Sequence, residues 1–317
     1  MLALLFPGQG SQAVGMGRDV YEACAEARAV FDAADAALGL PLARICFEGP
    51  EAALRPTEIQ QPALLATSMA LLRALEARVT VSAAYVAGHS LGEYTALVAS
   101  GALALDDALR LVHARGRFMQ EAVPEGRGAM AAVLGAPAQV VERACEEARR
   151  RTGGVVAPAS YNAPEQVVVA GEAAAVEAAC AAAREAGARR TVSLPVSAPF
   201  HCALMAPAAE KLAPELARVP LRAPRPPLVC NVDAEPQADP QRILELLRRQ
   251  MTAPVRFAEM VRRLASLGVT RVLEIGPGRV LSGLVARTEA GLARANLAGL
   301  DDLPGAAGFV APSHGRS

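Results

Sequence analysis

The sequence contains no tryptophan, only 3% aromatic residues and a single lysine, Lys211. Its Lys and Arg total 32 and its Asp and Glu total 32, so the formal net charge is zero. This balance argues against nucleic-acid binding or attachment to a membrane surface, because both need a basic surface. No apolar run is long enough to span a bilayer. Met1–Phe6 has no basic region and ends at Pro7-Gly8, so it predicts a buried strand and not a signal peptide.

The cysteines are few and scattered, with no Cys-x-x-Cys pair and no histidine at a metal-binding spacing. The six are Cys24, Cys46, Cys145, Cys180, Cys202 and Cys230. Such a distribution is typical of reduced thiols in a cytoplasmic protein. It predicts no metal site.

The order of the expected elements indicates an α/β fold. A strand at 2–6 leads into a glycine-rich turn, helical patterns follow at 19–37 and 60–77, and a strand and helix occupy 83–100. A further helix is expected at 105–122. Strands that alternate with helices predict a parallel sheet.

Between residues 128 and 197 the pattern becomes βαββαβ, which is the ferredoxin-like order. About seventy residues suffice for such a unit, so we interpret it as an inserted α+β subdomain. The core is then discontinuous and comprises 1–127 and 198–317. Residues beyond about 300 are rich in Gly, Ala, Pro and Ser and predict a frayed tail.

Gly88-His89-Ser90-Leu91-Gly92 follows an apolar run and precedes a helix-competent segment. A Gly-x-Ser-x-Gly pentapeptide between a strand and a helix is typical of a nucleophile elbow, in which a sharp turn projects the serine hydroxyl into a pocket. The motif also occurs in ordinary turns, since Gly and Ser are common there. The strand–turn–helix setting favours Ser90 as a nucleophile.

A serine nucleophile needs a base, because a free hydroxyl is barely ionised at neutral pH. The sequence offers His89 inside the elbow, His113 in a helix, His314 in the tail and His201 where the inserted unit returns to the core. A histidine in a Pro-containing loop is often merely exposed. Elimination among the four nevertheless makes His201 the best candidate.

Two further features carry candidate roles. Arg115 falls at the edge of the apolar face of the 105–122 helix, where a guanidinium needs an anionic partner. That partner is either a structural carboxylate or the carboxylate of a substrate. In the Gly8-Gln9-Gly10 turn, the N–H of Gln9 is a candidate oxyanion donor together with the N–H of Leu91.

Together these segments resemble the malonyl-CoA:acyl-carrier-protein transacylases of fatty-acid synthesis and the acyltransferase domains of polyketide synthases. The resemblance covers roughly residues 4–300. Its markers, in order, are Phe6-Pro7-Gly8-Gln9-Gly10-Ser11-Gln12, Gln61-Pro62-Ala63-Leu64, Gly88-His89-Ser90-Leu91-Gly92-Glu93-Tyr94, Arg115-Gly116-Arg117-Phe118-Met119-Gln120, Pro199-Phe200-His201 and Glu274-Ile275-Gly276-Pro277-Gly278. It implies an α/β-hydrolase-like core with a parallel sheet, a nucleophile elbow and an inserted ferredoxin-like subdomain.

The resemblance implies a role for each matched residue. Ser90 is the nucleophile, His201 the base, Gln9 and Leu91 the oxyanion donors, and Arg115 the ligand of the malonyl carboxylate. Gln250 orients the histidine through its main-chain carbonyl. Asn162 lies near the acyl pocket, and Phe200 before the histidine matches the malonyl-type members. No cofactor is implied, since malonyl-CoA is a substrate.

The implied partners are malonyl-CoA and holo acyl carrier protein, with no nucleic acid and no membrane. Carrier proteins are usually acidic, which makes Arg149-Arg150-Arg151 and Arg189-Arg190 candidate docking clusters, although such clusters are commonly solvated faces. Three alternatives stay open. They are a free-standing acyltransferase of a polyketide synthase, a serine thioesterase or esterase on the same elbow, and a silent scaffold that only binds carrier protein.

Overall fold

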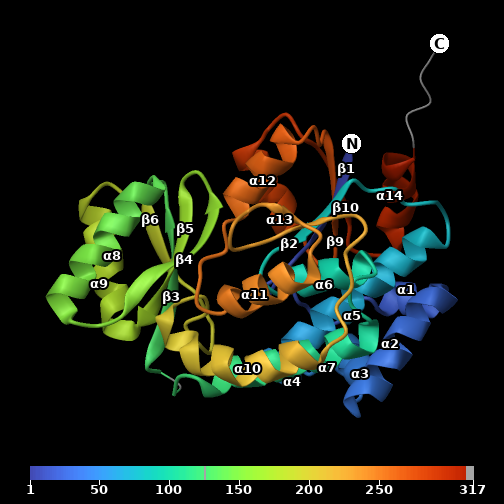
Figure 1. Cartoon of the computed structure of the whole chain (residues 1–317), viewed down its shortest axis with the longest axis horizontal. Helices are drawn as coiled ribbons and strands as arrows, with labels where there is room; N and C mark the ends of the chain where they lie inside the picture. The colour runs from blue at the N-terminus through green and yellow to red at the C-terminus, as the bar shows by residue number, and fades with distance from the viewer. Residues whose placement is uncertain (125, 312–317) are drawn as a thin grey trace.

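The computed structural model describes residues 1–124 and 126–311, and these form a mixed α/β fold with two sheets (Figure 1). The strands of the larger sheet, in spatial order, are β10 (Ala293–Leu297), β9 (Arg271–Ile275), β1 (Leu2–Phe6), β2 (Tyr85–Gly88), β7 (Leu228–Val229) and β8 (Pro236–Gln237). Neighbours from β10 to β7 pair in parallel, and β8 pairs antiparallel with β7. The predicted α/β fold with a parallel sheet is confirmed.

Helices surround this larger sheet (Figure 1). They are α1 (Arg18–Ala23), α2 (Ala25–Leu38), α3 (Leu42–Glu48), α4 (Glu51–Leu54), α5 (Thr57–Glu76), α6 (Leu91–Ala99), α7 (Leu105–Glu121), α10 (Ala206–Arg218), α11 (Pro240–Gln250), α12 (Phe257–Ser266), α13 (Val280–Thr288) and α14 (Leu303–Val310). Two short 3-10 turns, Ala203–Met205 and Leu300–Asp302, precede α10 and α14.

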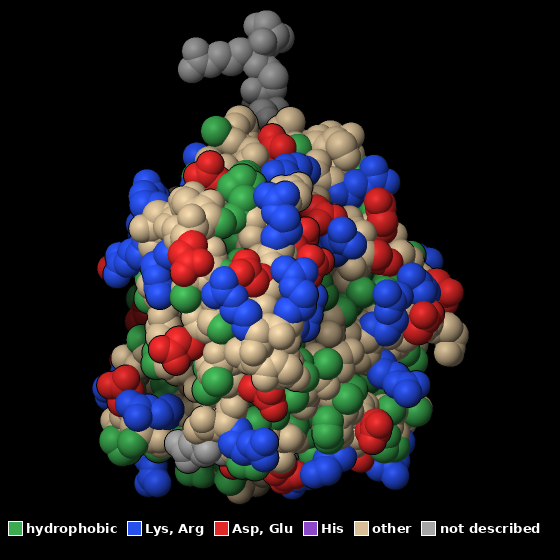
Figure 2. Space-filling model, turned by 90° about the vertical axis from the view of Figure 1, so that its left-hand side faces the viewer, with side chains coloured by type: hydrophobic (Ala, Val, Ile, Leu, Met, Phe, Trp, Pro, Cys, Tyr) green, Lys and Arg blue, Asp and Glu red, His purple; other side chains and the backbone are tan. Residues whose placement is uncertain are grey.

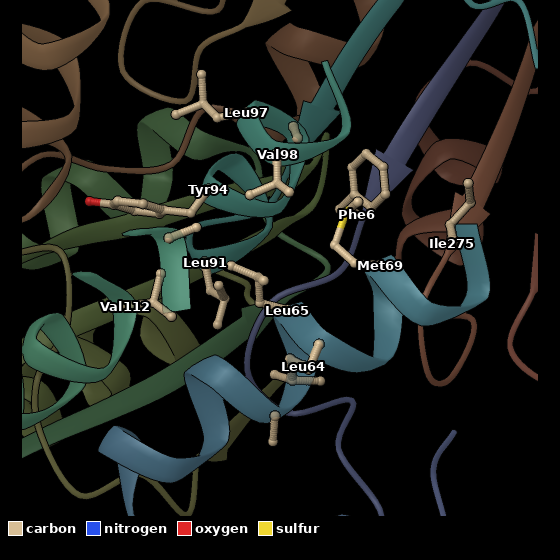
Figure 3. Close-up of a cluster of buried hydrophobic side chains, with 14 of the residues drawn as sticks. Phe6, Leu64, Leu65, Met69, Leu91, Tyr94, Leu97, Val98, Val112 and Ile275 are labelled. Carbon is tan, nitrogen blue, oxygen red and sulfur yellow. The ribbon is translucent and has the colours of Figure 1, made fainter. Parts of the chain in front are cut away.

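The β1 strand is apolar at every position because helices cover both faces of the sheet. Leu4 and Phe6 belong to the cluster formed with α2, α5, α6 and α7. Ala3 and Leu5 alternate with them and face the second cluster, which contains residues of α12 and α13. Figure 3 shows side chains of β1, α5 and α6 converging, with Phe6 beside Met69. This packing fixes the carboxyl end of β1 against the start of α6.

The smaller unit lies to the left in Figure 1 and has an antiparallel sheet. Its strands, in spatial order, are β4 (Val156–Ala163), β5 (Gln166–Glu172), β3 (Gly128–Leu134) and β6 (Arg190–Ser193). One sheet face packs on α8 (Ala138–Thr152) and α9 (Ala173–Glu185), through residues such as Val133. The other face, through residues such as Met130 and Val168, joins the core of the larger unit.

Several expectations for the sequence were wrong. The helix expected at 19–37 is two helices, because Cys24 has an extended backbone conformation. The tail expected from about 300 contains α14, whose Leu303, Ala306 and Val310 are buried. The last residues, 312–317, lie outside the described part of the chain. The elements α3, α4, β8, α13 and β10 were not predicted.

Neither a membrane-crossing segment nor a metal cluster is found in the part of the chain that the structure describes. Within 1–124 and 126–311, every helix is too short or too polar to cross a bilayer. In the same ranges, no three His, Cys, Asp or Glu side chains gather closely enough to hold a metal ion.

Candidate active site

Ser90 occupies the sharp turn between β2 and α6. Its φ of 53° and ψ of −104° lie in a region that side chains rarely adopt, at a cost of about 1–3 kcal/mol. The turn is pressed against the end of β1, where the N–H of His89 donates to the carbonyl of Phe6 over 3.0 Å. A Cβ at Gly92 would lie 2.0 Å from that same carbonyl oxygen, so glycine is required there. The predicted strand–turn–helix setting is therefore present.

Asn231 and Gln250 hold the strained turn in place. The Ser90 N–H donates to Oδ1 of Asn231 over 2.7 Å, and Nδ2 of Asn231 donates to the carbonyl of Gly88 over 2.7 Å. Nε2 of Gln250 donates to the carbonyl of Ser90 over 3.0 Å. The sequence analysis did not predict a role for Asn231. Its position just beyond β7 could have indicated one, because functional residues gather at this carboxyl edge of a parallel sheet.

Ser90 and His201 form a hydrogen-bonded dyad, although a long stretch of chain separates them. Oγ of Ser90 lies 2.8 Å from Nε2 of His201, and Nδ1 of His201 donates to the main-chain carbonyl of Gln250 over 2.8 Å. Since a carbonyl only accepts, Nδ1 carries the proton and Nε2 presents its lone pair to the serine. Burial, reinforced by the Arg115 charge, lowers the pKa of His201 to about 3. The imidazole is therefore neutral and able to accept a proton.

Arg115 is completely buried beside this dyad. Its Nη1 donates to Oε1 of Gln61 over 2.6 Å, and its Nη2 donates to Oε1 of Gln250 over 2.8 Å and to Oγ of Ser90 over 3.1 Å. The guanidinium also lies 5.2 Å from the centroid of the Tyr94 ring. Among residues 1–124 and 126–311, no carboxylate forms a salt bridge with Arg115, which contradicts the alternative of a structural ion pair.

The residue before Gln9 packs on the elbow, since a Cβ at Gly8 would lie 2.4 Å from the main-chain oxygen of His89. The Gln9 side chain turns away and donates to Oε1 of Gln60 over 2.7 Å. Leu91 begins α6, so its N–H has no partner within the helix. Within the described residues, neither N–H donates to another protein group.

Of the other candidate residues, Asn162 contacts the elbow and Phe200 lies next to the base. Oδ1 of Asn162, on β4, lies 2.8 Å from Nε2 of His89, so His89 faces the smaller unit and not Oγ of Ser90. Phe200 is buried in the main core next to His201. His113 is engaged elsewhere, because its Nδ1 donates to the carbonyl of Glu58 over 2.9 Å. The remaining histidine, His314, lies outside the described residues.

The arginine clusters on the smaller unit are partly engaged within the protein. Nη1 of Arg149 donates to the carbonyl of Val156 over 2.7 Å, and Arg151 pairs with Glu147. Arg189 and Arg190 are exposed. Figure 2 shows the face that carries this unit, where Lys and Arg side chains alternate with Asp and Glu. The face is therefore mixed in charge and not uniformly basic.

Comparison with known proteins agrees with this geometry. The family model described as an acyl transferase domain matches residues 3–304. This chain belongs to the acyltransferase family. The acyltransferase is 48% identical over 285 residues to a protein of Escherichia coli K12 named malonyl CoA-acyl carrier protein transacylase, covering 90% of this chain and 92% of the relative. It is 46% identical over 287 residues to a protein of the same name from Bacillus subtilis, covering 90% of each chain.

Solved structures extend the agreement to nearly the whole length of this acyltransferase. A malonyl-transacylase in complex with a type II PKS acyl-carrier protein superposes with a TM-score of 0.94 at 44% identity, covering 97% of this chain and 99% of the other. An acyl carrier protein S-malonyltransferase from Vibrio cholerae superposes with a TM-score of 0.93 at 43% identity, covering 96% and 99%.

Proposed function

We propose that this acyltransferase moves the malonyl group of malonyl-CoA to the phosphopantetheine thiol of acyl carrier protein, through a malonyl ester of Ser90. The observation that carries the proposal is the position of Arg115, a buried cation 3.1 Å from the serine hydroxyl. Its protein partners are neutral oxygens, so its charge is available to an acyl group that ends in a carboxylate. The names of the relatives support the same substrate and acceptor.

In the first half-reaction, Nε2 of His201 takes the proton of Ser90 while Oγ attacks the thioester carbonyl. The N–H groups of Gln9 and Leu91 stabilise the oxyanion that forms. Arg115 binds the malonyl carboxylate and, through Nη2, stabilises the negative charge that develops on Oγ. The tetrahedral intermediate then expels the CoA sulfur, and the proton on His201 passes to this thiolate. The products are CoA and malonyl-O-Ser90.

The second half-reaction reverses these roles. His201 accepts the proton of the phosphopantetheine thiol, and the sulfur attacks the ester carbonyl. Collapse of the intermediate expels Oγ of Ser90, which regains its proton from His201. Because Gln250 keeps Nδ1 protonated through its main-chain carbonyl, the same tautomer serves both halves. The chain itself supplies nucleophile, base and oxyanion donors, and we propose that no cofactor takes part.

We further infer that the core is α/β-hydrolase-like and that the smaller unit is a ferredoxin-like insertion. Support comes from the elbow at the end of β2 and from the strand order β4-β5-β3-β6. We retain the limits 1–127 and 198–317 for the core and 128–197 for the insertion. A cytoplasmic location remains a prediction.

Two alternatives differ in the acceptor. Service to a polyketide synthase keeps the same chemistry, and it is favoured by the relative solved with a type II PKS acyl-carrier protein. A thioesterase or esterase would transfer the acyl group to water and would usually orient its histidine with a carboxylate. The contact of His201 with the carbonyl of Gln250 argues against that arrangement.

The test is the intact mass of the protein after brief mixing with malonyl-CoA, with Ser90→Ala as the control. We expect a malonyl adduct on the wild type alone, and its discharge by holo acyl carrier protein. An adduct lost to water as fast as to carrier protein would favour the hydrolase. An adduct formed only with another acyl-CoA would retain Ser90 and refute malonyl as the substrate. Comparison of fatty-acid and polyketide carrier proteins as acceptors distinguishes the two pathways.

A further inference from the structure

Glu93, three residues after the nucleophile, is a buried carboxylate that the mechanism above does not use. Its side chain is 1% exposed, and within the described residues it forms no salt bridge. Burial raises its pKa to about 7, and hydrogen bonds from Asn231 and Gln250 oppose that rise. A buried charge without a counter-ion is costly unless hydrogen bonds compensate it.

A capping role for Glu93 does not account for its contacts. In a capping box, a glutamate at the third helical position accepts from the main-chain N–H of the N-cap residue. Here the N-cap residue is Ser90, and its N–H donates to Asn231 instead. Oε1 of Glu93 accepts from the N–H of Asn231 over 3.1 Å, and Oε2 accepts from Nε2 of Gln250 over 2.5 Å. The carboxylate thus reaches past its own helix terminus to α11.

The Gln250 amide lies between two opposite charges, which fix its orientation together with the carbonyl of Ser90. A carboxylate only accepts and a guanidinium only donates, so Nε2 must face Glu93 and Oε1 must face Arg115. The second contact is 2.8 Å long. The result is a chain from carboxylate to amide to guanidinium. It balances the buried charge of Arg115 without placing an acid directly on it, so Nη1 keeps a donor for a substrate.

We propose that Glu93 is a positioning residue that sets malonyl selectivity by orienting the amide of Gln250 toward Arg115. This inference rests on the proposed malonyl transfer. With a neutral group at position 93, Nε2 keeps only the neutral acceptors of Ser90 and Asn231, so the amide turns over more readily and presents its NH2 to the guanidinium. Arg115 then loses an acceptor and its place beside Ser90. Malonyl transfer, which needs the guanidinium, suffers more than transfer of a neutral acyl group.

Glu93→Gln tests this by the ratio of Ser90 acylation rates with malonyl-CoA and acetyl-CoA, measured in single turnovers at pH 8. The ratio does not depend on the fraction of folded enzyme. Loss of one oriented hydrogen bond to a charged group predicts a fall of about tenfold or more. The matched control is Glu274→Gln, which also removes a buried carboxylate. Glu274 accepts from the N–H groups of Leu281 and Ser282, away from the dyad, so its variant keeps the wild-type ratio.

The double variant Glu93→Gln/Gln250→Glu separates positioning from structural support. It keeps the buried net charge and the main-chain carbonyl of residue 250, but it places a carboxylate directly on Arg115. Positioning predicts that the ratio stays low even where thermal stability recovers. A wild-type ratio in this variant or in Glu93→Gln overturns the proposal, and the double variant alone decides it if the single variant does not fold. A wild type that forms no malonyl adduct refutes the proposed function instead.

Discussion

Replacement of Arg115 by alanine separates malonyl binding from the chemistry at Ser90. Gln61 and Gln250 each take an N–H from one terminal nitrogen of the guanidinium. Each terminal nitrogen carries a second N–H. That of Nη2 faces Oγ of Ser90, so a malonyl carboxylate can accept the one on Nη1. A hydrogen bond to a charged group contributes about 1.5–3 kcal/mol. One such bond corresponds to roughly a 10- to 200-fold loss in kcat/KM for malonyl-CoA.

Acetyl-CoA is the internal reference for Arg115→Ala. An acetyl group has no carboxylate, so it loses only the contact of Arg115 with Ser90, which both substrates share. The ratio of the two acylation rates, followed by intact mass in single turnovers, should therefore fall by the full carboxylate contribution. A ratio unchanged from the wild type would refute the reasoning, because malonyl and acetyl transfer would then have fallen equally.

Stability is the main complication of this experiment. Arg115→Ala leaves the side-chain oxygens of Gln61 and Gln250 buried without a donor, at about 1–3 kcal/mol each. The ratio of rates is unaffected by partial unfolding. Arg115→Lys serves as the matched variant, since it keeps a cation but not the planar fork. We expect its ratio to lie between those of the wild type and the alanine variant.

Three further outcomes are expected. Gly92→Ala should abolish soluble folded protein, measured by circular dichroism, because its Cβ would lie 2.0 Å from the carbonyl oxygen of Phe6; a wild-type melting curve would contradict the packing described. Asn231→Ala should lower the free energy of unfolding by about 1–3 kcal/mol in denaturant titrations, because the Ser90 turn loses its partner. It should also reduce kcat more than it changes KM. Unchanged stability together with an unchanged kcat would contradict the role given to Asn231. Because the pKa of His201 is lowered to about 3, the base stays neutral as pH falls through 6.5. Acylation by acetyl-CoA should accordingly show no acid limb near pH 6.5 in a rate profile, and an inflection there would show an ordinary histidine.

The features predicted correctly are those determined by residues that lie close together in the sequence. Ser90 was identifiable because its glycines and its flanking strand and helix are consecutive in the chain. The helical periodicity placed Arg115 toward the apolar face, and its complete burial followed the same direction. The strand β10 escaped detection because it lies at a sheet edge with exposed residues, so it lacks a continuous apolar run.

The partners of these residues depend on contacts between distant segments. Nothing near Asn231 in the chain indicates that its amide binds the Ser90 turn, and nothing near Glu93 indicates that it meets α11. The sequence left a structural carboxylate open as the partner of Arg115, whereas the fold supplies the amides of Gln61 and Gln250. Such groups come within hydrogen-bonding distance only when the sheet edge and the helices assemble, so these contacts cannot be predicted from one sequence.

The connection between the two units has a consequence for engineering. A Cβ at Gly128 would lie 2.4 Å from the Pro199 ring, so the chain enters and leaves the smaller unit at nearly the same point. The segment between Gly128 and Pro199 therefore begins and ends at neighbouring points of the larger unit. In a chimaera that carries the equivalent segment of a relative, both ends of that segment should fit the same junction with the larger unit. His201, two residues beyond this junction, remains with the recipient, whereas Asn162 is replaced by its counterpart from the donor.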